Sequence, residues 1–260
     1  MNDGEINFLT LQFSEYLENT FAEEFFENSL ITVRAGALLS LFLYAVFGFL
    51  DSCLFPDSRV GLWAIRYAIV CPFILAVYCF SFHPHFKRFL QAAISVSILG
   101  AGLGIVAMTV ILPSPRSYDY YSGLILIVML SYAFTPLRFL HSALTAWGLI
   151  LAYDIAAIWL SHTPLPVLAE NNFLLISSSL IGMFAAYNIE LYIRRDFLQT
   201  YRLKAEREKS EQLQQQVRQL TIEIDQGKRA RQVAEITETD YFQELQEKSR
   251  LIRSRAKQQQ

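Results

Sequence analysis

Six separate runs of apolar residues, each close to the length of a membrane-spanning helix, constrain the fold of this chain more than any other feature. A helix needs about 20 predominantly apolar residues to cross the hydrocarbon core of a bilayer. The runs cover residues 30–50, 61–82, 89–112, 121–137, 139–160 and 173–193. Because the connections between them are short, the sequence predicts an all-α integral membrane protein with a six-helix transmembrane bundle over residues 30–193.

The boundary between the fourth and fifth runs is the tightest of these connections. Pro136 and Arg138 interrupt the apolar sequence there, and proline is a strong turn signal. We therefore expect residues 135–138 to form the turn.

Hydrophobic residues make up 53% of the 260 positions, above the roughly 45–50% of ordinary soluble domains.

The first 29 residues are predicted to form an amphipathic N-terminal helix, with its periodic part over residues 6–26. One face carries Phe13, Leu17, Phe21 and Phe25, and the other carries Glu15, Glu18, Glu23 and Glu24. This segment has no basic residue, so it lacks the positive region of a signal peptide and is expected to be retained. Its acidity disfavours binding to an anionic lipid surface. We expect it to pack against the bundle or against a second subunit.

The last apolar run leads directly into a charged helical segment, residues 194–226. Arg194 and Arg195 end the run, and no Pro or Gly follows until Gly227, so nothing stops the helix at the membrane surface. Four apolar residues then recur at spacings of four, three and four, as in a coiled-coil seam. They are Leu213, Val217, Leu220 and Ile224. The sequence predicts a long cytoplasmic coiled-coil helix that forms a homodimer through this seam.

The seam does not extend back to the membrane in one register. Its register places Glu206 and Ser210 at core positions, whereas Leu198 and Tyr201 fit a shifted register. Such a stutter weakens packing. Two interpretations remain open, a spacer helix and a helix that transmits a change of register. Gly227 is a plausible hinge, after which residues 227–260 are predicted to form a second coiled-coil segment and a polar tail.

Basic residues in the short connections predict the orientation in the membrane. Of the 22 Lys and Arg residues, 15 lie from Arg194 onward. Lys87, Arg88 and Arg138 fall on the same predicted side of the membrane as Arg194, whereas Arg59 and Arg116 fall on the other side. Both termini are therefore expected to be cytoplasmic.

Ionisable residues within the spans are costly in lipid and usually face the bundle interior. On the predicted outer side, three spans contribute Asp51, Arg66 and Asp154 at similar depth, and Tyr120 and Tyr121 enter the fourth span there. This group is a candidate ligand-binding site. The alternative is a structural clamp, in which the charges pair with one another and fix the order of the helices.

A second charged group lies at the predicted inner side. Glu190 is near the inner end of the last span, Arg34 begins the first span at that depth, and Arg138 lies in the inner turn. A pair between Glu190 and one of these arginines is expected. If Glu190 changes partner, it does so beside the helix that leaves the membrane, so these residues are a candidate switch.

Other sequence features point to packing rather than chemistry. Gly100 and Gly104 have the GxxxG spacing of closely packed membrane helices, and packing within one chain is favoured. His83, His85, His141 and His162 have no strong metal-ligand spacing, and neither have the three cysteines. We expect no metal, no cofactor and no nucleic-acid partner. No nucleotide-binding loop or catalytic triad pattern is evident, so no enzymatic activity is expected.

Five short segments carry a family resemblance, residues 65–72, 120–124, 137–143, 204–211 and 233–245. The first three resemble the six-helix membrane domain of bacterial class III adenylate/guanylate cyclases and related cyanobacterial sensor proteins. Residues 204–211 are similar to the transducing helix of that family, and residues 233–245 are similar to linkers before catalytic modules. The resemblance implies a dimeric, receptor-like bundle in a bacterial plasma (inner) membrane that signals through a coiled coil. No cyclase, kinase or diguanylate cyclase domain is recognisable, so the activity is not carried over.

These observations lead to a functional hypothesis with two rivals. The leading expectation is a membrane sensor whose bundle responds to an outer-side or lipid ligand and whose coiled coil engages a separate cytoplasmic effector, such as a cyclase or kinase. The alternative is a passive membrane anchor that presents a coiled coil. A small transporter is less favoured, because the ionisable residues form no path across the bilayer and no span before the last has a broken-helix pattern.

Overall fold

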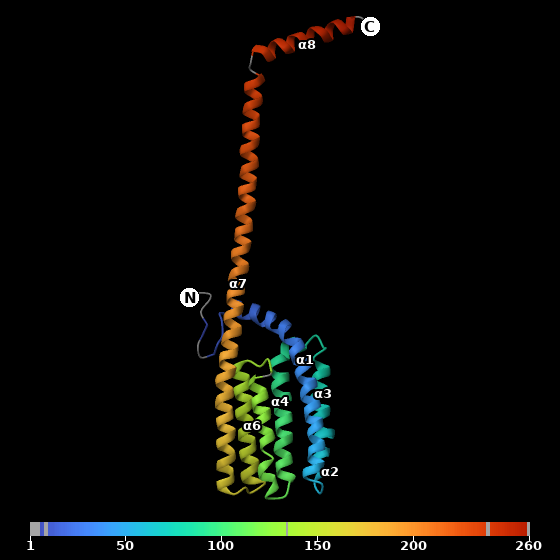
Figure 1. The fold of residues 1–260 in the computed structure, drawn as a ribbon, viewed down its shortest axis with the longest axis vertical. Coiled ribbons are helices and arrows are strands. Elements are labelled where there is room, and N and C mark those ends of the chain that lie inside the picture. The colour runs from blue at the N-terminus through green and yellow to red at the C-terminus, as the bar shows by residue number, and fades with distance from the viewer. Residues whose placement is uncertain (1–5, 8–9, 134, 238–239, 259–260) are drawn as a thin grey trace. The chain divides into compact units, whose positions relative to one another are not determined.

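The computed structural model describes residues 6–7, 10–133, 135–237 and 240–258. All regular secondary structure in these ranges is helical (Figure 1). The chain divides into two compact units, residues 1–198 and residues 199–260. The first unit is a helical bundle, and the second contains the C-terminal part of α7 together with α8.

The helices follow one another along the chain with short connections. They are α1 (Glu15–Leu54), α2 (Arg59–Trp63), the π-helical segment η1 (Ala64–Val70), α3 (Cys71–Phe80), α4 (Phe86–Ile111), the 3-10 helix η2 (Arg116–Asp119), α5 (Ser122–Ala133), α6 (Phe139–Trp159), α7 (Leu165–Thr237) and α8 (Asp240–Gln258). The segments α2, η1 and α3 form one helical stretch without a gap.

Five helical stretches in the described residues are long and apolar enough to cross a membrane, and the predicted fourth span is the exception. The five are Glu15–Leu54, Arg59–Phe80, Phe86–Ile111, Phe139–Trp159 and Leu165–Thr237. Helix α5 has 12 residues, about 18 Å of α-helix. The predicted turn is confirmed, because residues 135–138 are not helical and α6 begins at Phe139. The count of six spans remains a prediction.

Helix α4 holds the bundle together, because it packs against α1, α3, α5 and α6. Its glycines permit this close packing. A Cβ atom at Gly104 would lie 2.5 Å from Val70 Cγ2 and 2.8 Å from Tyr44 Oη, and one at Gly100 would meet the ring of Phe73. The GxxxG spacing therefore serves packing within the chain, as predicted.

The surface of the bundle is rich in exposed large apolar side chains. On α1, Phe42 and Phe49 are exposed, and on α6 and α7 so are Leu144 and Phe184. An exposed apolar surface of this extent marks contact with something other than water. Together with helices of spanning length, it indicates that the bundle lies in a membrane.

The N-terminal segment packs on the bundle, as the amphipathic pattern predicted. The rings of Phe13 and Phe21 lie 5.8 and 5.3 Å from the ring of Phe197 on α7, and Leu17 joins this cluster. The predicted extent was wrong. Residues 10–14 are not helical, and α1 begins at Glu15 and continues without a break through the first apolar run. Residues 8 and 9 of the predicted helix lie outside the described ranges.

In the second unit, helix α7 passes through Gly227 and ends at Thr237. The helix is therefore not interrupted at Gly227, and a hinge there stays a prediction. A glycine costs a helix only about 1 kcal/mol relative to alanine, and the residues around it are mostly good helix formers. The four seam residues, Leu213, Val217, Leu220 and Ile224, are 53–61% exposed in this single chain.

Candidate functional site

Arg66 lies in the π-helical segment that joins α2 to α3. Pro72 follows this segment and has no N–H to donate to the preceding turn, so the regular α-helical ladder is interrupted at this point. Wider π-helical turns are frequent at functional positions. The guanidinium group of Arg66 is almost completely buried.

Asp51, Arg66 and Tyr120, which we call the Arg66 cluster, are joined by direct hydrogen bonds. Arg66 Nε donates to Asp51 Oδ2 at 2.9 Å, and Arg66 Nη2 donates to Tyr120 Oη at 2.8 Å. Tyr120 Oη donates in turn to Asp51 Oδ1 at 2.8 Å. Arg66 Nη1 also donates to the backbone carbonyl of Tyr44. The buried charges are thus paired and hydrogen-bonded, as burial requires.

Two of the predicted outer-side residues lie elsewhere. Asp154 Oδ1 accepts a hydrogen bond of 2.8 Å from Asn172 on α7, so Asp154 is not paired with Arg66 as the clamp alternative allowed. Tyr121 packs its ring against Tyr153, with the centroids 6.3 Å apart. Similar depth in the membrane did not determine which way these side chains point around their helices.

The Arg66 cluster forms the polar part of a cavity of about 530 Å³. The cavity lies between α1, α4 and α5, and its other walls are mostly apolar side chains. Ligand pockets in proteins have volumes of roughly 300–1,000 Å³. The structure therefore places the predicted site residues Asp51, Arg66 and Tyr120 beside a space of suitable size.

A second buried network, the Arg194 cluster, lies where the N-terminal part of α1 meets α7. Arg194 has no exposed surface. Its Nε donates to Glu190 Oε1 at 2.8 Å, and its Nη1 donates to Glu18 Oε2 at 2.8 Å. The guanidinium carbon also lies 4.4 Å from the ring centre of Phe21. One arginine thereby connects α1 to α7.

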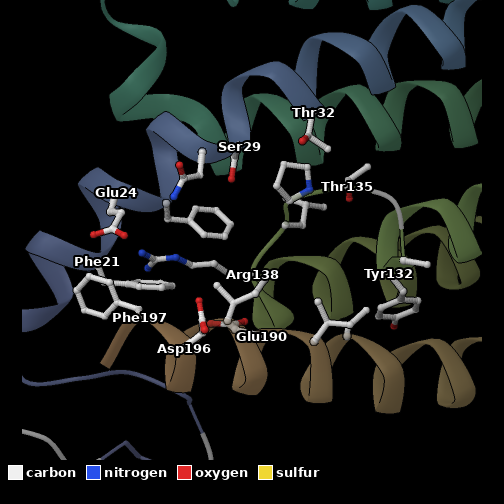
Figure 2. A pocket seen from close by; sticks show the side chains of 18 residues that line it. Phe21, Glu24, Ser29, Thr32, Tyr132, Thr135, Arg138, Glu190, Asp196 and Phe197 are labelled. Atoms are coloured by element: carbon white, nitrogen blue, oxygen red, sulfur yellow. The ribbon is translucent and has the colours of Figure 1, made fainter. Parts of the chain in front are cut away.

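The turn before α6 joins the same network. Arg138 Nη1 lies 3.0 Å from Glu18 Oε1, and the backbone N–H of Phe139 donates to Glu190 Oε2. Figure 2 shows Arg138 extending toward Phe21 at the edge of a cavity of about 370 Å³. The Arg194 cluster, Glu18, Arg138, Glu190 and Arg194, therefore connects three separate parts of the first unit.

Glu18 precedes the apolar run of α1 and is ionised in this network. Burial of its carboxyl group acts to raise its pKa, but the hydrogen bonds from Arg194 and from the Phe13 N–H and the nearby arginine charges outweigh this effect. The pKa of Glu18 is therefore lower than the ordinary value for glutamate. The shift reflects stabilisation of the carboxylate by its partners.

The structure corrects the predicted inner-side pairs. Glu190 pairs with Arg194 rather than with Arg34 or Arg138. Arg34 donates from Nη2 to the carbonyl of Ser81 at the C-terminal end of α3 and lies over the ring of Phe82, and a cation is favourable at a helix C-terminus. Arg138 belongs to the cluster, but through Glu18.

Sequence reasoning missed two members of this network. The spacing of Glu190 and Arg194, four residues apart on one helix, was a usable signal, because such residues are neighbours on a helix surface. Glu18 carried no comparable signal. The helical pattern placed it among the solvated acidic residues, and its main partner lies 176 positions later in the chain.

The fold and its apolar surface define a polytopic, all-α membrane protein with buried charge networks near the helix ends. A model of the MASE8 family, a family of membrane-associated sensory domains, matches residues 49–204. The chain belongs to this family. The match includes Asp51, Arg66, Tyr120, Glu190 and Arg194, and it begins after Glu18. No match was found among curated proteins or among solved structures.

Family membership makes this chain a membrane-associated sensory protein. It bears out the sensory part of the sequence-based hypothesis. The narrower resemblance to the membrane domains of class III cyclases stays a prediction, as do the coiled-coil dimer and its effector.

Proposed function

We propose that this protein is a homodimeric sensor of the bacterial plasma (inner) membrane, with both termini in the cytoplasm, that passes a signal from its helical bundle through α7 to a cytoplasmic effector. The observation that carries the proposal is the match to a sensory domain family over residues 49–204. The effector is a nucleotidyl cyclase, a kinase or another signalling enzyme, and the chain itself performs no catalysis.

The Arg194 cluster is the proposed point of transmission. Arg194 lies near the C-terminal limit of the first unit, which ends at Leu198, and it is held by Glu18 on α1. A movement of α1 along or around α7 has to stretch or exchange this buried ion pair. Because interfaces of this kind have discrete arrangements, a small movement can select between two of them.

The exposed apolar seam supports the proposed dimer. Leu213, Val217, Leu220 and Ile224 repeat at coiled-coil spacing and are exposed in the single chain. Burying apolar surface is favourable by about 25 cal/mol per Å². Two copies in one membrane present their C-terminal helices in the same direction, so a parallel pair is proposed.

A reporter fusion separates a sensor from a passive anchor. Residues 1–226 are joined to a cyclase domain that is active only as a dimer, and product formation is measured in membranes with equal amounts of protein. For a sensor, Arg194→Lys, which keeps the charge but loses the forked geometry, changes the output. For a passive anchor, output follows only the amount of protein. The exposed Arg195→Lys is the matched control.

The orientation is tested independently of the signal. Topology reporters fused at residue 1 and after residue 226 should both report the cytoplasm. A reporter on the opposite side at either end would overturn the proposed arrangement, because it would change the number of membrane crossings.

A further inference from the structure

The cavity of about 530 Å³ beside the Arg66 cluster has a polar part and a long apolar part. On α1, its lining extends from Ser40 to Leu54, a length of about 20 Å along a helix. On α5, it extends from Ser122 to Leu130. Asp51 and Tyr120 lie toward one end of both segments, so the space is elongated and polar at that end.

The cavity is open toward the lipid side of the bundle. Helices α1 and α5 each pack on α4, and side chains of all three helices form the walls. Leu50 on α1 and Leu126 on α5 both line the cavity and are 47% and 57% exposed. An alkyl chain in the bilayer can therefore enter between α1 and α5 without unfolding either helix.

The charges at the polar end limit what the cavity accepts. Arg66 is the one basic side chain among the described residues that line it, and Arg66 is committed to Asp51. Asp119 adds a carboxylate. An anionic head group would compete with Asp51 for Arg66 and leave a carboxylate unpaired, which is costly in a low-dielectric place. A hydroxyl group can exchange hydrogen bonds with Tyr120 at no cost in charge.

We propose that this cavity binds an uncharged amphiphile with a single alkyl chain, such as a monoacylglycerol, with its hydroxyl head at Tyr120 and its chain between α1 and α5. This inference rests on the proposed sensory function, since it names the class of ligand for that function. The bound chain lies against α1, and α1 is the helix that carries Glu18 to the Arg194 cluster.

Photolabelling of the full chain in phosphatidylcholine nanodiscs tests the site. The probe is monolauroylglycerol with a diazirine in its acyl chain, and labelled peptides are identified by mass spectrometry. We expect label in residues 40–54 and 122–130. Unlabelled monolauroylglycerol should compete, and the anionic lauroyl lysophosphatidic acid should compete at least about tenfold less well.

Two variants fill the cavity without disturbing the core. Leu126→Trp and Leu50→Trp place a large ring in the opening at partly exposed positions, and each should reduce labelling of both segments at least about tenfold. Leu144→Trp, on α6 at an exposed position outside the cavity lining, should leave labelling unchanged.

Three results would overturn the proposal. The first is equal labelling of all lipid-exposed helices with no effect of Leu126→Trp, and the second is equal competition by the anionic lipid. The third is labelling that occurs in detergent but is lost in nanodiscs, because this would show that bilayer phospholipid occupies the cavity. The reporter fusion separates the two proposals. Specific labelling together with an unchanged reporter output for Arg194→Lys would refute the sensory role alone. A changed reporter output for Arg194→Lys together with no specific labelling would refute the ligand class alone.

Discussion

Arg194, which is buried, and Glu18, which is partly buried, lie 176 positions apart in the chain and form an ion pair with Nη1 and Oε2 2.8 Å apart. This contact fixes the N-terminal part of α1 against α7. The aromatic rings of Phe13, Phe21 and Phe197 pack around it. The pair is therefore both a structural joint and the place where movement of α1 would reach α7.

Removing Arg194 should destabilise the first unit strongly. Arg194→Met leaves the carboxylates of Glu18 and Glu190 without their shared partner, and breaking a buried pair from one side costs roughly 3–5 kcal/mol. Thermal unfolding of the purified full chain measures the loss. Arg195→Met, at an exposed neighbouring position, is the matched control and should unfold like the wild type. Equal melting temperatures for both variants would show that the pair contributes no net stability.

The Glu18 contribution should depend on pH in a defined direction. The pKa of Glu18 is lowered in the folded state, so its stabilising effect is complete above the ordinary glutamate pKa of about 4.3 and is lost as pH falls through the lower folded-state value. Glu18→Gln should therefore unfold at a lower temperature than wild type at about pH 7. The difference should shrink as the pH is lowered below about 4.3. A difference that is constant across this range would contradict the assigned role of the carboxylate.

The Arg66 cluster offers a test of pairing by double substitution. Arg66→Gln leaves Asp51, which is 2% exposed, with a buried charge and should cost roughly 3–5 kcal/mol. Adding Asp51→Asn removes that charge and should recover a large part of the loss. Thermal unfolding of both variants gives the coupling between the two residues. Arg66→Gln combined with Asp154→Asn is the control. Recovery of stability in this control, rather than with Asp51→Asn, would indicate that Arg66 pairs with Asp154 instead of Asp51.

Two glycines should respond differently to substitution by alanine. A Cβ at Gly104 would lie 2.5 Å from Val70 Cγ2, and overpacking a tight site costs about 1–3 kcal/mol. At Gly36 no atom lies within 4 Å of the added Cβ, and alanine favours a helix by up to about 1 kcal/mol over glycine. Gly104→Ala should lower the melting temperature and Gly36→Ala should keep or raise it. Stabilisation at both positions would refute the close approach of η1 and α4.

The sequence predicted much of this fold because its patterns are local. Helical periodicity identified the buried face of Leu17 and Phe21 on α1, and proline identified the turn before α6. The short helix α5 was not predictable in the same way. Its apolar run extends to residue 137, but Pro136 and the turn limit the helix to Ser122–Ala133. Composition measures how apolar a run is and not how much of it is helical.

The charge networks were predicted only where depth in the membrane was sufficient information. Asp51 and Arg66 lie at similar depth on consecutive helical stretches, and they pair. Asp154 lies at similar depth but faces Asn172, because the rotation of α6 about its axis is set by packing with α4 and α5. Glu18 could not be assigned for a similar reason, since tertiary packing brings it to Arg194.

Dimerisation is expected to occur through the C-terminal helix. Val217 and Leu220 occupy core positions of the predicted seam, and Ile222, which is also apolar and 57% exposed, falls outside it. Disulfide crosslinking between copies is measured through Ile224→Cys, in a chain whose native cysteines, Cys53, Cys71 and Cys79, are replaced by serine.

Changing Val217 and Leu220 to lysine places charges in the core of a parallel coiled coil, where apolar packing provides the stability, so crosslinking should be lost. Ile222→Lys changes an equally exposed apolar residue on the outer face and should leave crosslinking intact. Loss of crosslinking in both variants would indicate general disruption of the helix. Crosslinking that survives the double lysine substitution would show that the two copies meet elsewhere, and the signal would then have to leave the bundle by a route other than this seam.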